Sequence, residues 1–251
     1  RQRAARPPWA NAPTKRPVAE LGRGKGAFYG LSPPQPGWRR VIVKARIARH
    51  GTSDLAAARA HQHYIMRDGV TRDGGSGQLY DRERDTIDAG DFLDSQKSDT
   101  YQFRLIVAPE DGARMADLKP FIRDLMATMQ DDLGTKLDWV AVDHFNTGHP
   151  HTHIVIRGKD DRGQDLIIAR DYMSHGFRMR ARELITLELG PEIESDMTLK
   201  LAREVEAERF TRLDRALLAH TKRGYLAISA MPPAECHTHA AHMGRLRKLE
   251  Q

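Results

Sequence analysis

Apolar and polar residues alternate in a stretch near the beginning of the chain, at residues 40–47. The alternation places apolar and basic side chains on opposite faces of an extended segment: Val43, Ala45 and Ile47 against Lys44 and Arg46. Residues 101–107 form a second run of β-forming side chains, which ends at Pro109. Both runs predict β-strands.

Apolar residues at helical spacing mark the segment 117–133, and Gly134 is expected to end this helix. An earlier helix is predicted over residues 54–68, with Ser53 as its N-cap and Gly69 as its C-terminal stop. The side of the later helix that faces the core is expected to carry Leu118, Phe121, Ile122, Leu125, Met126 and Met129.

Weaker patterns cover the rest of the chain. Residues 70–98 are predicted to form a long loop with a short helix at 88–95, and residues 166–168 a short strand. Further helices are predicted over 171–189 and 195–210. This order of elements predicts an α+β fold with a largely antiparallel central sheet, flanking helices mainly on one side, and a helical C-terminal extension. One face of the sheet would then be free to carry functional side chains.

A β-hairpin is predicted from residues 137–144 and 151–156, because both runs are rich in β-formers and the segment between them contains Asn, Gly and Pro. The hairpin holds four of the twelve histidines within ten residues. This density makes it the centre of the functional interpretation.

Three of these histidines converge on one face of the hairpin. Side chains alternate along a strand, so His151 and His153 point the same way, and His144 faces His151 with Cβ atoms roughly 5 Å apart. Three neutral imidazoles predict a site for a divalent transition metal that leaves positions open for a substrate oxygen. The alternative is a hairpin with surface histidines. His149 lies in the turn and is not required as a ligand.

Composition and charge add a class of partner. The chain has 251 residues with 39% hydrophobic and 29% charged residues, and a net charge of +6 at pH 7. This charge favours an acidic partner such as nucleic acid, although solubility alone would also explain it. Cys236 is the single cysteine, so no internal disulfide is expected and a reducing compartment is indicated.

The distribution of residues predicts three regions. Residues 1–38 are rich in Arg, Lys, Pro and Gly and are expected to form a disordered basic arm. Residues 39–190 are expected to form the main domain, and 191–251 a helical extension that begins a further domain cut short. No apolar run approaches the length of about 18 residues typical of a membrane span, and no signal peptide is evident, although the chain starts at Arg1 without Met.

The hairpin motif resembles that of a known family. The spacing His144-x6-His151-x-His153, with Pro150 before the second histidine, resembles the three-histidine motif of HUH-type conjugative relaxases, the mobilisation nucleases of the MobP and VirD type. Residues 60–69 are similar to the first motif of these enzymes, which carries a tyrosine on a helix, and residues 102–109 to the second. The likeness covers about residues 40–190 and extends to a long subgroup with an uncharacterised C-terminal extension.

This resemblance implies an HUH endonuclease fold and a metal-dependent, site- and strand-specific DNA nicking and rejoining activity. Tyr64 would be the nucleophile and form a 5′-phosphotyrosyl link to single-stranded DNA. His144, His151 and His153 would hold Mg²⁺ or Mn²⁺ at the scissile phosphate. No second tyrosine lies within a turn of Tyr64, which argues against a replication initiator that transfers twice in succession.

Further residues are expected to assist. His61 and Arg67 lie one turn before and after the tyrosine and are candidates for acid-base roles or phosphate contacts, because a phenol with a pKa near 10 needs activation. Asn146 stands where many relatives carry Asp, which puts any acid-base role of that position in doubt. Lys44, Arg46 and Arg104 are expected to contact DNA phosphates.

The resemblance also implies partners and a setting. The substrate would be single-stranded DNA at the origin of transfer of a plasmid or integrative element, and nicking would initiate conjugative transfer. Relaxosome accessory proteins and a type IV secretion coupling protein would be partners. The protein would act in the bacterial cytoplasm and be exported with the DNA to the recipient cell.

Two other functions remain open from the residues alone. The run 149–155 superficially resembles the alternating histidines of HIT-type nucleotide hydrolases, although Pro150 and Thr152 replace apolar residues of that pattern. A non-catalytic, metal-stabilised DNA-binding module is the second alternative.

Overall fold

The computed structural model describes residues 37–49, 55–222, 225–226 and 236–250. The chain divides into two compact units, one of residues 1–191 and one of residues 192–251. Nearly all of the expected basic arm lies outside the described residues. Among the helices that are described, none has the length and apolar content needed to cross a bilayer.

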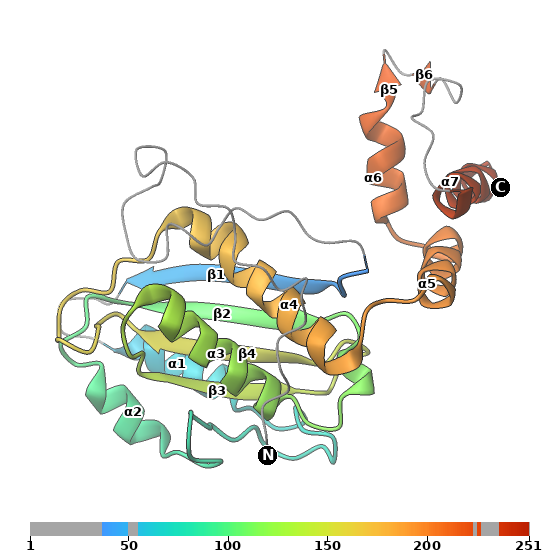
Figure 1. Cartoon of the computed structure of the whole chain (residues 1–251). Coiled ribbons are helices and arrows are strands. Elements are labelled where there is room, and N and C mark those ends of the chain that lie inside the picture. The colour runs from blue at the N-terminus through green and yellow to red at the C-terminus, as the bar shows by residue number, and fades with distance from the viewer. Residues whose placement is uncertain (1–36, 50–54, 223–224, 227–235, 251) are drawn as a thin grey trace, which may run out of the picture. The chain divides into compact units, whose positions relative to one another are not determined.

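An antiparallel sheet of four strands forms the centre of the first unit (Figure 1). Its strands are β1 (Val41–Arg49), β2 (Tyr101–Pro109), β3 (Trp139–His144) and β4 (His151–Arg157). They lie in the order β1-β2-β4-β3, so β4 pairs with both β2 and β3. The predicted α+β class, the antiparallel sheet and the histidine hairpin are confirmed.

Two helices, α3 (Lys119–Leu133) and α4 (Phe177–Leu189), cover one face of this sheet, in front of the strands in Figure 1. The apolar stripe predicted for α3 is buried, and Gly134 ends the helix with a φ of 62°. The helix begins two residues later than predicted, because the Asp117 carboxylate accepts a hydrogen bond from the backbone N–H of Lys119 and holds the chain in a turn.

The opposite face of the sheet is not free, contrary to the prediction. Helices α1 (Ala56–Ile65) and α2 (Ala89–Ser95) lie over part of it. The reason is the apolar surface that β3 and β4 present there, which must be buried. This second core joins Ile65, Leu79, Ile87 and Phe92 to Val140, Val142 and Val155.

Helix α1 is shorter than the predicted 54–68. Ser53, the expected N-cap, lies outside the described residues, and Leu55 precedes the first turn without a side-chain cap. The helix ends at Ile65 because the chain then turns at Gly69, which has a φ of 81° and donates to the carbonyl oxygen atoms of Gly74 and Gly75. The short helix predicted at 88–95 is confirmed as α2, with Asp88 as its N-cap.

The short strand predicted at 166–168 is wrong. Lys159 and Asp165 form an isolated bridge, and the backbone N–H of Leu166 donates to the carbonyl oxygen of Gly158. Leu166 is buried while Ile167 is exposed, and the segment is held by this single bridge and backbone hydrogen bond rather than by a strand ladder. The helix predicted from residue 171 is present, but its first turns form the π-helical segment η4 (Tyr172–Gly176).

The second unit contains α5 (Glu194–Glu206), α6 (Arg212–Ala219) and α7 (Cys236–Leu249), with the short strands β5 (Thr221–Lys222) and β6 (Tyr225–Leu226). Helix α6 was not predicted, although Thr211 and Asp214 form a capping box at its start. The predicted helix 195–210 ends at Glu206, because Arg245 of α7 donates hydrogen bonds to three carbonyl oxygen atoms along the segment that follows: those of Val205, Ala207 and Arg209.

Candidate metal and nucleophile site

The three histidines of the hairpin meet as predicted. His144 pairs with His151 in the register of β3 and β4. The ring centroids of His144 and His153 lie 4.5 Å apart, and His151 lies 5.2 Å from each of them. One nitrogen of each ring lies within 4.8 Å of the others, a spacing that allows a single divalent ion to bind all three.

The hydrogen bonds of His144 favour a metal ligand. Its Nε2–H donates to the backbone carbonyl oxygen of Ile65 at 2.7 Å. Its Nδ1 is buried and has no hydrogen-bond partner among the described residues. A histidine that ligates a metal typically donates its other ring N–H to a carbonyl group, which fixes the tautomer. The buried Nδ1 therefore fits a metal ligand better than a structural histidine.

The turn orients the second ligand. The Nδ1–H of His151 donates to the backbone carbonyl oxygen of His149 at 3.0 Å, which leaves Nε2 as the ligand atom. His149 thus contributes its backbone, in agreement with the expectation that its side chain is not required. Asn146 lies exposed in the same turn. The three-histidine group that could hold an ion does not include it.

Burial keeps the imidazoles of His144 and His153 neutral, and neutral imidazole is the form that binds metal. The pKa of His153 is lowered to about 3, first by burial and then by the neighbouring His144 and His151. Burial also lowers the pKa of His144. The pKa of His61 is lowered to about 4 by burial and by the positive charges of Arg104 and Arg46.

Tyr64 lies on the exposed side of α1 beside this group, with 55% of its surface exposed. Its ring centroid is 6.4 Å from that of His153. The guanidinium of Arg67 stacks over the tyrosine ring at 4.4 Å and also donates to the Tyr64 backbone oxygen. His61 lies at the same distance of 6.4 Å from His153. The structure therefore brings the predicted nucleophile and its two predicted helpers to the histidines.

The predicted DNA-contacting residues lie on this same face. Arg46 pairs with Arg104 across β1 and β2, and Arg104 pairs in turn with Val155 of β4, two residues after His153. Side chains in register share a face of the sheet, so Lys44, Arg46 and Arg104 extend the histidine face towards β1. Arg104 also donates to the backbone oxygen of Ala57, which ties β2 to the first turn of α1.

Comparison with known families agrees with this geometry. Residues 77–181 match the family model described as relaxase, MobA/VirD2-like, nuclease domain. Residues 77–181 of the chain are therefore similar to a relaxase nuclease domain. A search of curated proteins found no match. The predicted resemblance to MobP- and VirD-type relaxases is thereby confirmed, and DNA nicking in conjugative transfer is the general activity that the match supports.

The matched part of the relaxase domain includes Arg104 and all three histidines, but it begins after Tyr64 and after β1. The family depends on a divalent metal and acts on single-stranded DNA at an origin of transfer. The roles of Tyr64 and of the residues on β1 therefore rest on the geometry described above.

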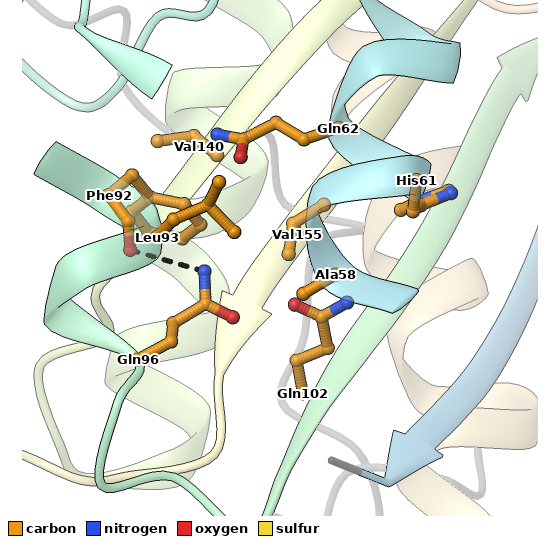
Figure 2. Close-up of a pocket in the computed structure, with 9 residues that line it drawn as sticks. All are labelled: Ala58, His61, Gln62, Phe92, Leu93, Gln96, Gln102, Val140 and Val155. Atoms are coloured by element: carbon orange, nitrogen blue, oxygen red, sulfur yellow. Dashed lines mark hydrogen bonds between the residues drawn. The ribbon is translucent and has the colours of Figure 1, made fainter. Parts of the chain in front are cut away.

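Sequence reasoning missed how α1 is held in place. Gln62 of α1 donates to the backbone oxygen of Ala89 in α2, and Gln96, the C-cap of α2, donates to that of Phe92. Figure 2 shows both amides around a small cavity between the helices and the sheet, with Val155 of β4 on its wall. Gln62 is buried together with Ala58 and Ile65 on one side of α1, but the sequence did not indicate what this amide bonds.

A second missed group lies on the other face of the hairpin. The Tyr80 hydroxyl and the Thr152 hydroxyl both donate to Oδ1 of Asp143, at 2.8 and 2.6 Å. Asp143 points away from the histidines, as the alternation predicts. Burial raises the pKa of Asp143 to about 6 and raises that of Tyr80 well above its usual value. Tyr80 lies in the predicted loop, where no pattern marked it.

Proposed function

We propose that this relaxase nicks and rejoins one strand of DNA at the origin of transfer of a plasmid or integrative element, and so initiates conjugative transfer. Tyr64 is the nucleophile. The observation that carries the proposal is the position of the exposed Tyr64 side chain. Its ring centroid lies 6.4 Å from that of His153, which belongs to the group of three converging histidines. The family match supports nicking, and the arrangement of α1 supports this residue.

The reaction is a transesterification. The phenolic oxygen of Tyr64 attacks the phosphorus of one phosphodiester, and the bond from phosphorus to the 3′-oxygen breaks. The tyrosine loses its proton, and the 3′-oxygen takes one up to leave as a hydroxyl group. The products are a 5′-phosphotyrosyl link and a free 3′-hydroxyl. The phosphoester is conserved, so the reverse attack rejoins the strand without ATP.

His144, His151 and His153 would hold the divalent ion. When bound, it withdraws charge from a non-bridging phosphate oxygen and stabilises the transition state. Between the two expected ions, three imidazole ligands favour Mn²⁺ over Mg²⁺, because Mg²⁺ prefers oxygen ligands and retains its water. The fixed tautomers of His144 and His151 orient the rings before the ion arrives.

Arg67 and His61 assist Tyr64 in different ways. The guanidinium of Arg67 lies over the phenol ring, so its positive charge stabilises the phenolate that forms during attack. His61 is neutral at physiological pH because its pKa is about 4, which makes it a weak proton acceptor. We assign it a hydrogen bond to the phosphate or the tyrosine hydroxyl rather than the role of a strong base. Asn146 is exposed and is assigned a hydrogen bond to the DNA backbone.

Basic residues hold the strand. Lys44, Arg46 and Arg104 lie on the face of the sheet that carries the histidines, and phosphate groups along the bound strand neutralise them. The arm of residues 1–38 adds contacts that do not depend on sequence. Residues 39–190 form the nuclease domain in this proposal, and 191–251 form a helical extension.

The setting follows from the proposed activity. Single-stranded DNA at the origin of transfer is the substrate, and accessory proteins of the relaxosome present it. A type IV secretion coupling protein receives the covalent complex. The protein then acts in the bacterial cytoplasm and is exported with the DNA.

The test is covalent capture. The chain is incubated with a pool of single-stranded oligonucleotides from plasmid origins and Mn²⁺, and an adduct is sought that survives SDS. Tyr64→Phe removes one exposed hydroxyl, so it should fold and bind DNA as before but form no adduct. Tyr101→Phe removes a hydroxyl that bonds the backbone of Leu166 elsewhere in the unit, and it should keep the adduct. An adduct in Tyr64→Phe would assign the nucleophile to another residue.

The same experiment separates the two alternatives. A HIT-type hydrolase would cleave nucleotides equally well with and without the Tyr64 hydroxyl. A DNA-binding module would retain the oligonucleotide but cleave none with any divalent metal. The family match at residues 77–181 favours the relaxase over both.

A further inference from the structure

A second cleft lies on the face of the hairpin opposite the histidines. Its volume is about 630 Å³, within the range of small-molecule sites. The segment after α1, the start of α3 and the end of β3 line it. Asp143 in its wall directly precedes His144 in β3, and the two side chains point to opposite faces of the sheet. The cleft is therefore separate from the metal site but adjacent to it along the chain.

Two cation–aromatic pairs form flat walls of the cleft. The guanidinium of Arg72 lies 4.0 Å from the ring centroid of Phe145, and the ammonium of Lys119 lies 5.3 Å from that of Tyr80. Arg72 is held in place by a hydrogen bond of 2.8 Å to the backbone oxygen of Met115. Aromatic rings and guanidinium planes of this kind are surfaces on which unpaired bases stack.

A carboxylate in a fixed position completes the cleft. Tyr80 and Thr152 both donate to Oδ1 of Asp143, so these two bonds fix the carboxylate while neither uses Oδ2. Lys119 and Arg72 supply donors in the lining of the cleft, which also includes the carboxylates of Asp73 and Asp117. The cleft thus offers a ligand both an acceptor and cationic donors, between planar side chains.

We propose that this cleft binds one unpaired guanine of the single-stranded DNA substrate, and the proposal rests on the function proposed above. Guanine presents the O6 and N7 acceptors and, on another part of its rim, an amino donor. Lys119 and Arg72 match the acceptors, and Asp143 matches the donors. Thymine lacks an amino group, and adenine lacks a carbonyl acceptor. Cytosine has the acceptors O2 and N3, but its amino group lies beside them on the same edge, whereas guanine presents O6 and N7 on a different edge from its amino group. The cleft then supplies sequence recognition that the basic face cannot, because phosphate contacts do not read bases.

The position of the cleft suits a base near the scissile phosphate. Phe145 on its wall directly follows His144, so a strand that leaves the histidines around the end of the hairpin passes the cleft at once. The guanine is therefore expected within a few nucleotides of the nick. The basic side chains of β1 and β2 would hold the part of the DNA strand that lies on the other side of the nick.

The test measures base preference without cleavage. The probe is a fluorescent oligothymidine of about twelve nucleotides, a typical single-strand site size, compared with the same probe in which one central thymidine is guanosine, adenosine or cytidine. Binding to the full chain is followed by fluorescence anisotropy at pH 8 with a chelator present. The guanine probe should bind about tenfold more tightly than the others. Equal binding of all four probes by the wild-type chain would overturn the proposal.

Variants test whether the cleft produces this preference. Asp143→Asn replaces the carboxylate with an amide of the same shape and should reduce the preference for guanine at least threefold. Asp143 is also a structural hydrogen-bond acceptor, so Lys119→Gln provides an independent test at the cleft and should reduce the preference as well. Lys136→Gln removes the same charge at an exposed site elsewhere and should leave the preference unchanged. A preference that persists in both cleft variants would place guanine recognition somewhere else.

The failure of this proposal and of the proposed function can be told apart. An adduct that forms in the presence of Mn²⁺, from a chain with no guanine preference, would support nicking and overturn the cleft. A guanine preference that depends on Asp143 and Lys119, in a chain that forms no adduct, would support the cleft and contradict the nuclease.

Discussion

His153 makes the stability of the nuclease unit depend on pH. Burial and the neighbouring His144 and His151 lower its pKa from 6.5 to about 3 in the folded chain. Solvent reaches the ring in the unfolded chain, where the pKa returns to about 6.5. Between these two values the unfolded chain binds a proton that the folded chain does not bind.

Protonation in this window therefore favours unfolding. The stability linked to His153 is fully present above about pH 6.5 and falls as the pH decreases towards 3. Each pH unit corresponds to about 1.4 kcal/mol for one such group, so about 2 kcal/mol would be lost between pH 6.5 and pH 5. Partial solvent screening of the ring reduces this to about 1–2 kcal/mol.

His153→Gln removes this titrating group and keeps a polar side chain of similar length. Urea unfolding across a pH series, with a chelator present, gives the free energy of unfolding, and the fluorescence of the buried Trp139 reports on this unit. The variant should lose about 1–2 kcal/mol less than the wild type between pH 6.5 and pH 5.

His63→Gln is the matched control, because solvent reaches His63 on α1 in both states. Its pH dependence should follow the wild type. An equal loss of stability in the wild type, the control and His153→Gln would refute the argument, since it would mean that the ring of His153 is protonated as easily in the folded chain as in the unfolded chain.

Three further predictions concern metal, DNA and packing. His151→Ala should weaken Mn²⁺ binding by at least tenfold, because two ligands replace three; unchanged calorimetric titration would place the metal elsewhere. Deleting residues 1–38 should flatten the dependence of DNA affinity on salt in anisotropy experiments and leave the choice of nick site unchanged. If the deletion instead removed the preference for the nick site and left the salt dependence unchanged, residues 1–38 would read the sequence rather than bind phosphates. Gly77→Ala should lower the free energy of unfolding by about 1–3 kcal/mol, because its new Cβ would lie 2.7 Å from Val142. Gly148→Ala meets no atom within 4 Å and is the control in the same denaturation assay.

The strands and the long helix were predictable because their determinants are local. The apolar stripe of α3 has the helical period over four turns, and Gly134 stops it through its own backbone preference. The hairpin was predictable because a short turn between two β-rich runs leaves few registers. That register alone places His144 opposite His151, so the three-histidine cluster followed from the sequence once the hairpin did.

Features set by distant residues could not be predicted. Nothing in the sequence of β4 indicates that it lies between β2 and β3, since strand order depends on the whole sheet. The segment after α1 looked like a loop, yet Tyr80 in it forms a bridge to Ala141 and is fully buried. The expectation of a free sheet face failed for the same reason. That expectation took account of the histidines at one end of the face, but not of the apolar side chains of Val140 and Val142 on the same face, which must be buried.

One backbone oxygen connects the two halves of the proposed catalytic group. The carbonyl of Ile65 accepts the Nε2–H of His144, and Ile65 directly follows Tyr64 at the end of α1. The bond that fixes the tautomer of a proposed metal ligand therefore also fixes the last turn of the helix that carries the proposed nucleophile. Ile65 itself is fully buried against β3 and β4, so this turn cannot shift without disturbing the second core. A site on a helix is held more precisely than one on a loop, and here the helical backbone and the buried anchor both fix the position of the Tyr64 phenol. This explains why the tyrosine is placed on a short helix whose C-terminal residue packs against the histidine hairpin.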